Sequence, residues 1–181
     1  WSNPLLQPER GRNLDLGLAW TQGVHEVKLV HFDNRIRGFI TSGTAPVNVP
    51  HARIDGWTLG YTGRPGDFSL RASVDALDPH DEVTGRKLPR RADRNATAGV
   101  EWARGDWRLG STAQYVGRRF DDTANTLPMD PWTTLDVYAT WQFVRDMSLQ
   151  LRVNNLSDRQ YETIRGYNQA GRSAYVTLRW Q

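Results

Sequence analysis

The sequence has no cysteine, only two methionines and no long apolar run. Without cysteine, disulfide frameworks, cysteine-based metal sites and thiol catalysis are excluded. A membrane-spanning helix needs about 20 consecutive apolar residues, and no stretch of this chain approaches that length. Charge of one sign is also scarce, because 23 basic residues face 20 acidic ones for a net charge of +3. That balance does not indicate a nucleic-acid partner.

The sequence does have a clear alternation of apolar and polar residues with a period of two. Because successive side chains of a strand point to opposite faces, each such segment has one apolar and one polar face. Residues 25–40 follow the pattern less cleanly, since Val30 and Phe32 fall on the polar face, which indicates either an inward-pointing aromatic or a β-bulge. With this segment, the sequence predicts about nine strands and no helix. The clean segments are 14–20, 57–62, 68–76, 96–102, 107–115, 135–143, 147–153 and 173–180.

The connections between these segments alternate in length. Short turns are expected near 22–24, 63–66, 104–106 and 144–146, and long loops near 41–51, 78–91, 120–131 and 156–171. Outer-membrane barrels have this asymmetry, with short periplasmic turns and long extracellular loops. A water-soluble sandwich has no reason to keep it so regularly. The predicted fold class is therefore all-β, an antiparallel transmembrane β-barrel.

Five of the eight tryptophans gather at one end of the predicted strands. They lie within a few residues of a short turn or of the C-terminus, on the apolar side by parity. A girdle of aromatic rings at the headgroup level is typical of outer-membrane barrels. The predicted girdle residues are Trp20, Trp102, Trp107, Trp141 and Trp180.

Charged residues fall on the opposite parity of the same strands. An arginine that faces lipid at the bilayer midplane costs about 2–4 kcal/mol, so we expect these side chains to face the barrel interior. There they would form a series of ion pairs along the wall and against a plug. The predicted lumen-facing residues are Arg71, Asp75, Glu101, Arg108, Asp136, Arg152 and Arg179.

The loop rule also sets the direction of the strands. The final strand, 172–181, is expected to run inward and end in the periplasm, so residues 1–10 would lie outside the cell. Nine strands with an external start would leave open edges, which lipid does not tolerate. Further strands are therefore expected upstream. No signal peptide begins at Trp1, so a mature or truncated chain is expected.

Several motifs resemble those of one family. Asn154–Glu162, followed by Gly166-Tyr167 and Gly171-Arg172, is similar to the closing segment of TonB-dependent receptors. Ser2–Glu9 resembles the family's N-P-x-L-x-P-E element, and Phe32–Ile36 with Ile40 resembles its F-x-N-x-I strand. The resemblance covers residues 1–181, with 156–181 as the family's C-terminal segment. One departure is the end at Trp180-Gln181, where family chains usually end in Phe.

The resemblance implies the architecture and the partners. The family fold is a 22-stranded barrel closed by an N-terminal plug; this chain would hold about nine C-terminal strands, without the plug or the TonB box. The implied function is active import of a large, scarce ligand across the bacterial outer membrane, energised by the TonB–ExbB–ExbD complex through the plug. Outer-membrane lipid, lipopolysaccharide and the β-barrel assembly machinery are further implied partners. Calcium-binding loops of the family would lie upstream of these residues.

The segments 161–172 and 88–92 look most like the cobalamin-carrying subgroup, which implies a corrinoid as the transported ligand. A siderophore or haem is the alternative within the family. By this resemblance Arg90, beside Arg91, would reach the substrate, because a planar guanidinium suits amide and phosphate groups. The alternative is a rim arginine that contacts lipopolysaccharide phosphate or a loop carboxylate. A second loop tip could also touch substrate through Asp121, Asp122, Thr123 and Ala124.

Neither an enzyme site nor a metal site is predicted. No Ser/His/Asp arrangement is recognisable, which disfavours a barrel phospholipase or protease, and a purely structural barrel or adhesin is the other class considered. Asp78, His80, Asp81 and Glu82 stand in a predicted flexible loop with irregular spacing. They are therefore not expected to bind a metal ion.

Overall fold

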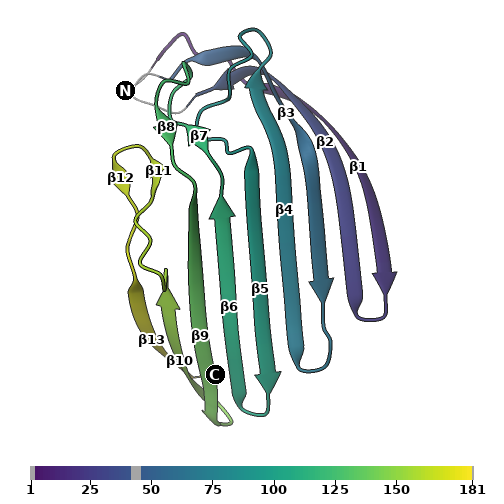
Figure 1. Ribbon diagram of the computed structural model, residues 1–181, viewed down its shortest axis with the longest axis vertical. Coiled ribbons are helices and arrows are strands. Elements are labelled where there is room, and N and C mark those ends of the chain that lie inside the picture. Colours follow the sequence, from purple (N-terminus) through teal and green to yellow (C-terminus); the bar gives the residue numbers. More distant parts are fainter. Residues whose placement is uncertain (1–2, 42–45, 181) are drawn as a thin grey trace.

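The computed structural model describes residues 3–41 and 46–180, and its main element is one antiparallel sheet (Figure 1). Neighbouring strands follow one another along the chain in the order β1-β2-β3-β4-β5-β6-β9-β10-β13. Two short hairpins, β7–β8 and β11–β12, lie in the loops at one end of the sheet. The nine strands of the sheet are β1 (Arg10–Gln22), β2 (His25–Ile40), β3 (Asn48–Gly63), β4 (Phe68–Asp81), β5 (Arg94–Arg104), β6 (Trp107–Val116), β9 (Trp132–Val144), β10 (Met147–Asn154) and β13 (Ser173–Trp180). The hairpins are β7 (Arg119–Phe120) with β8 (Pro128–Met129) and β11 (Glu162–Ile164) with β12 (Tyr167–Asn168).

The described residues include no helix long and apolar enough to cross a membrane.

Loop lengths alternate as the sequence predicts. Tight turns join the strands at the lower end in Figure 1, and the longer connections gather at the upper end. Gly23, Gly66 and Gly105 stand in three of these tight turns with φ between 57° and 58°. Glycine adopts a left-handed φ at lower cost than other residues, so these positions favour the tight turns at one end of the sheet.

Two strands are longer than the sequence predicts. β3 begins at Asn48 and β4 continues to Asp81, so the loops expected near 41–51 and 78–91 are shorter. Pro79 lies beyond Ala76, the last β4 residue in register with β5, where one edge of the strand is free of that neighbour and a proline is tolerated. Residues 42–45 of the first loop lie outside the described residues.

The strand with the irregular pattern keeps a continuous register. β2 pairs with β1 from His25 to Arg37 without a shift, so the bulge interpretation is wrong. Phe32 instead points to the polar face, since its neighbours His31 and Asp33 share the other face with Leu16 and Leu14. An inward aromatic is thus the correct alternative.

The two faces of the sheet differ in kind. The register puts large apolar side chains of successive strands on one face, the apolar face, where many are exposed; Leu16 is 63% and Val176 is 71% exposed. The buried cluster is small, consisting of Phe39, Val49, Ala52 and Leu88 near the loop end. A sheet that leaves one face apolar and uncovered is the expected wall of a membrane barrel.

The resemblance motifs hold the loop end together. Asn48 donates to the carbonyl of Gln7 at 2.9 Å and accepts from its amide at 2.8 Å, which fixes the segment before β1. Asn155, which is 4% exposed, accepts from the amide of Arg159 at 2.9 Å. The amide of Arg172 donates to Asp158 at 2.7 Å, at the start of β13. Ser2, at the start of the first motif, and Gln181, at the chain end, lie outside the described residues.

Candidate functional site

Arg90 stands where the connection from β4 to β5 folds back onto the polar face. The amide of Leu88 donates to the carbonyl of Pro79 at 2.9 Å, so the returning chain lies beside β4. Leu88 is 1% exposed and packs with Ala52. Arg90 then adopts a φ of 60°, and its amide donates to the carbonyl of Phe120 at 2.6 Å. Two loops are thereby joined at this residue.

The side chains of Arg90 and Asp121 form an ion pair. Nε of Arg90 lies 2.7 Å from Oδ1, and Nη2 lies 3.4 Å from Oδ2. Their side chains are 22% and 15% exposed, and the amide of Arg165 donates to the same carboxylate at 3.3 Å. Burial opposes ionisation, but the hydrogen bonds from Arg90 and Arg165 hold the pKa of Asp121 below its usual range. Two of the predicted substrate contacts therefore bind each other.

The remaining predicted residues of that loop shape its tip. The carboxylate of Asp122 accepts from the amides of Thr126 at 3.0 Å and Leu127 at 2.9 Å. Burial opposes ionisation here too, and these hydrogen bonds lower the pKa of Asp122. Thr123 and Ala124 are exposed. Their contact with a substrate stays a prediction.

A cavity of about 310 Å³ lies on the polar face beneath the loops. Arg90, Arg91, Arg119 and Trp132 line it, with Asn95 from β5. Arg91 is exposed, and its guanidinium has no hydrogen bond or ion pair within residues 3–41 and 46–180. Of the charged residues among the predicted substrate contacts, Arg91 is therefore the one whose donors are free of partners within the described residues.

Arg119 and Trp132 were missed by the sequence analysis. Arg119 is 6% exposed, and among the described residues it donates to the carbonyls of Gly117, Asp130 and Glu162. Burial lowers the pKa of Arg119, although nearby carboxylates oppose the shift. Among the described residues no carboxylate forms an ion pair with Arg119, and the carboxylates of Asp121 and Glu162 offset its positive charge from a longer distance.

Trp132 supplies the apolar side of the cavity. It is 7% exposed, its ring lies 4.3 Å from that of Tyr161, and its Nε1 has no partner among the described residues. The sequence holds one signal for Trp132. Even-numbered residues of β9 point to the polar face, so a tryptophan at position 132 lies on the face opposite the apolar one.

The predicted lumen-facing residues share one face, opposite the exposed leucines. Arg152 and Asp136 form an ion pair at 3.2 Å, the only one within this set among the described residues. Glu101 instead accepts from the hydroxyl of Tyr138, and Asp75 accepts from a threonine at 2.7 Å. The expected continuous series of ion pairs is therefore not formed within this sheet. Arg71, Arg108 and Arg179 lie exposed on the same face, whose contact with a lumen stays a prediction.

The predicted girdle residues lie on the apolar face near the tight turns. Trp107 and Trp141 are opposite each other on β6 and β9, and their rings stack 5.6 Å apart with an interplanar angle of 8°. Trp20, Trp102 and Trp180 occupy the same face near the ends of β1, β5 and β13. Their position at a headgroup layer stays a prediction.

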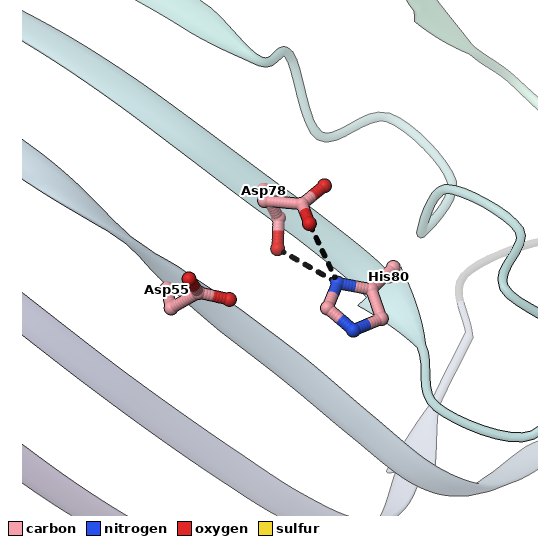
Figure 2. A group of neighbouring side chains, drawn as sticks. All are labelled: Asp55, Asp78 and His80. Atoms are coloured by element: carbon pink, nitrogen blue, oxygen red, sulfur yellow. Dashed lines mark hydrogen bonds and ion pairs between the residues drawn. The ribbon is translucent and has the colours of Figure 1, made fainter.

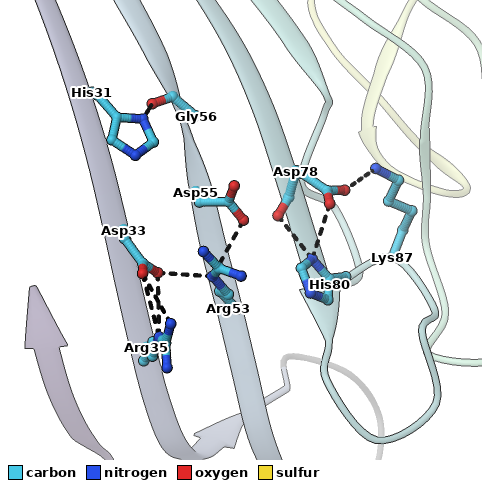
Figure 3. A network of polar contacts seen from close by, with 9 residues as sticks. All are labelled: His31, Asp33, Arg35, Arg53, Asp55, Gly56, Asp78, His80 and Lys87. Carbon is cyan, nitrogen blue, oxygen red and sulfur yellow. Dashed lines mark hydrogen bonds and ion pairs between the residues drawn. The ribbon is translucent and has the colours of Figure 1, made fainter.

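A charged cluster occupies the other end of the apolar face (Figure 3). Its side chains form two rows across the strands, because residues in register point to the same face. The basic row is Arg12, Arg35, Arg53, His80 and Lys87, and the acidic row is Asp33, Asp55 and Asp78. The sequence analysis missed both rows.

Part of this cluster has the composition of a metal site (Figure 2). Ligand atoms of Asp55, Asp78 and His80 lie within 4.8 Å of one another. Lys87 Nζ, however, lies 2.6 Å from Asp78, and Arg53 Nε lies 3.5 Å from Asp55. Cations of the protein thus already compensate these carboxylates, and we interpret the group as an ion-pair network. The expectation that it binds no metal stays a prediction.

The assignment of residues 78–81 to a flexible loop is wrong. Asp78, His80 and Asp81 belong to β4, where they pair with β3. Glu82 follows the end of the strand, and its amide donates to the carbonyl of His51 at 2.9 Å. Pairing with a neighbouring strand outweighs the local preference of this polar, proline-containing segment for a loop.

Comparison with known proteins gives a consistent family. The model for "TonB dependent receptor-like, beta-barrel" matches residues 1–156. The vitamin B12 transporter BtuB of Photobacterium profundum is 30% identical over 99% of this chain, and that of Vibrio vulnificus is 27% identical over 99%. The chain spans 31% of the length of each of these relatives.

Solved structures share the fold. The siderophore receptor PiuA from Acinetobacter baumannii has a TM-score of 0.80 at 21% identity, with 94% of this chain and 28% of that chain covered. The copper transporter OprC has a TM-score of 0.77 at 20% identity, with 97% and 32% covered. The antiparallel sheet, its apolar outer face and the matching family model together confirm the predicted fold class. The chain belongs to the TonB-dependent receptor β-barrel family.

Proposed function

We propose that this chain supplies the C-terminal strands of an outer-membrane transporter that imports a corrinoid, with cobalamin as the leading ligand. The observation that carries the proposal is the 30% identity over 99% of the chain to a protein named vitamin B12 transporter. The siderophore and copper proteins resemble this chain below 25% identity, so their likeness supports the fold alone. The assignment of 156–181 as the family's C-terminal segment is part of this proposal.

The cavity at the loop end suits such a ligand. Arg91 offers an available guanidinium, and Arg119 adds a positive charge that forms no ion pair with a carboxylate of the described residues. Amide and phosphate oxygens are good acceptors for such donors. Trp132 lines the same cavity, with its ring 4.3 Å from that of Tyr161 and tilted by 35° against it, and would give a corrinoid an apolar contact there. We assign Arg91 the direct contact, and Arg90 with Asp121 the role of holding the loops in place.

The orientation and the energy source follow as parts of the same proposal. The tight turns would face the periplasm and the loops the outside, so the C-terminal end of β13 would be periplasmic. A plug domain would close the barrel and contact TonB–ExbB–ExbD. The relatives are named transporters and receptors, and we propose no catalytic role and no calcium site for these residues.

Ligand titration of the full-length receptor tests the proposal. We expect cyanocobalamin to bind at micromolar concentration or below, and ferric siderophores and haem to bind more weakly. Arg91→Ala should weaken corrinoid binding about tenfold, the effect of losing one charge-assisted contact. Arg64→Ala, in a tight turn at the far end of the sheet, is the matched control and should bind as the parent does. Absence of corrinoid binding at micromolar levels would refute the ligand, and preferred binding of a siderophore or haem would replace it.

A further inference from the structure

The β11–β12 hairpin stands apart from the main sheet at its loop end (Figure 1). Its two strands pair with each other and with no other strand of the described residues. The base of the hairpin is fixed, because the side chain of Asn155 donates to the carbonyl of Arg159 at 2.9 Å and accepts from its amide at 2.9 Å. Asp158 accepts from the amide of Arg172 at 2.7 Å. Residues 160–169 therefore project from a fixed base.

Side chains of another loop hold the hairpin in place. Among the described residues, no backbone–backbone hydrogen bond joins residues 160–169 to another segment. Arg119 donates through Nη2 to the carbonyl of Glu162, and the carboxylate of Asp121 accepts from the amide of Arg165 at 3.3 Å. The position of the hairpin thus depends on a few side-chain contacts, as is typical of segments that open locally.

The hairpin forms one wall of two cavities. A cavity of about 790 Å³ lies between it and residues 126–132, with Tyr161 and Arg165 on the hairpin side. Thr163 lines the cavity of about 310 Å³, and Trp132 lines both. Trp132 is 7% exposed, and its ring lies 4.3 Å from that of Tyr161. Movement of the hairpin away from the sheet would open both cavities and uncover Trp132.

Arg119 is the buried link between the hairpin and the loop from β6 to β9. Its side chain is held within its own loop by Nη1, which lies 3.4 Å from the carbonyl of Gly117 and 3.5 Å from that of Asp130. Nη2 reaches across to Glu162 on the hairpin. Burial of a cation is costly unless its donors are satisfied, and the hairpin supplies one of the acceptors. The guanidinium therefore favours the closed position of the hairpin.

We propose that Arg119 is a positioning residue that pins the β11–β12 hairpin as a lid over the two cavities, and that the lid opens to exchange the ligand. Lids that close over a binding site commonly limit the rate at which ligand enters and leaves. The identity of that ligand rests on the proposed function, whereas the pin and the lid do not.

Hydrogen exchange of the amides of residues 160–169 in the ligand-free, full-length receptor measures the opening of the hairpin. Arg119→Lys keeps the positive charge but loses the planar fork that reaches carbonyls on two loops. Exchange in the hairpin should therefore rise about three- to tenfold, while the amides of β13 exchange as in the parent. Arg118→Lys is the matched control, because Arg118 is exposed and has no hydrogen bond or ion pair among the described residues. It should leave exchange in the hairpin unchanged.

Oxidation of Trp132 by hydroxyl radicals, measured by mass spectrometry on the same ligand-free proteins, tests whether the hairpin covers the cavities. Arg119→Lys should raise the rate of oxidation of Trp132, because the opened hairpin exposes the ring. Arg118→Lys should oxidise at this position as the parent does.

The rate constants for cyanocobalamin test the passage of ligand. The lysine variant keeps the charge beside the cavity, and the pin is the same with and without ligand. Association and dissociation should therefore both become about three- to tenfold faster, and the dissociation constant should stay within about twofold of that of the parent. A residue that contacts the ligand directly would change dissociation alone.

Unchanged exchange in the hairpin of the Arg119→Lys variant would overturn the pin. Faster exchange without faster oxidation of Trp132 would overturn the lid, as would faster dissociation of cyanocobalamin with unchanged association. If the parent binds no cyanocobalamin, the proposed ligand is wrong, and the exchange and oxidation results still decide on the hairpin because they need no ligand. If the lysine variant does not fold, Arg119→Met, which removes the buried charge, takes its place in those two measurements with the same outcomes.

Discussion

The ring of Tyr138 lies directly over the α-carbon of Gly110, its cross-strand partner on β6. Its hydroxyl donates to Glu101 on the next strand. Glycine at position 110 is therefore what allows an aromatic residue to lie flat on the polar face and to reach a carboxylate two strands away.

Gly110→Ala should destabilise the barrel by about 1–3 kcal/mol, because the added methyl group overlaps the tyrosine ring and forces it to move. Gly60→Ala is the matched control: it also lies within a strand, and the nearest atom to its added carbon is 4.0 Å away. The denaturant concentration at the midpoint of unfolding, measured for the full-length receptor in micelles, compares the stability of the two variants. Equal midpoints for the two variants would contradict the close approach of Tyr138.

Removal of either partner of the Arg90–Asp121 pair should loosen the loops. Each single alanine variant leaves a partly buried charge without its partner, which costs about 1–2 kcal/mol. The double variant should cost less than the sum of the singles, since the two groups bind each other. Hydrogen exchange of amides in residues 120–131 measures the opening free energy, and Arg86→Ala, an exposed change in the preceding loop, is the control. Additive effects would show that the pair contributes nothing.

The pH dependence of the same loop follows from its two aspartates. The pKa values of Asp121 and Asp122 are lower in the folded loop than in an unfolded chain. The two carboxylates therefore stabilise the loop fully at pH values above the pKa of an unfolded aspartate, about 3.9. This stabilisation is lost as the pH falls through their lower pKa values in the folded loop. Protection of the amides of Thr126 and Leu127, corrected for intrinsic exchange, should be constant from neutral pH to about pH 5 and fall below about pH 4. A loss of protection already between neutral pH and pH 5 would point to another group. The variant Asp122→Asn should lose less amide protection at acidic pH than the parent does.

The strands could be predicted from sequence because period-two alternation is a local property. The segment 107–115, for example, needs only its own residues to show which face is apolar, and glycines in the tight turns mark its end. The extension of β4 through Pro79 could not be predicted, since the segment has loop composition and its pairing with β3 is a tertiary contact.

The candidate functional site was harder to predict than the strands of the sheet. The sequence indicated Arg90 and Arg91 through a resemblance, but it could not show that Arg90 is paired with a residue 31 positions away. Arg119 was hidden because its partners are carbonyls, which have no sequence signature. The charged rows were hidden because each member reads as an isolated loop or strand charge until the register aligns Arg12 with Arg35 and Arg53.

The stacked pair Trp107 and Trp141 offers a test of the wall itself. Their rings are nearly parallel, 5.6 Å apart, on the apolar face beside the tight turns. Such stacking contributes about 0.5–1.5 kcal/mol beyond the area it buries, so single alanine variants should each lower the stability of the full-length receptor in micelles. The double variant should lose less than the sum of the singles by about that amount. Trp20 with Trp141 is the control pair, because β1 and β9 are not neighbours in the sheet and their effects should add. If the effects of the Trp107 and Trp141 substitutions were also additive, the two rings would interact with lipid separately. The cross-strand stack would then not stabilise this end of the barrel.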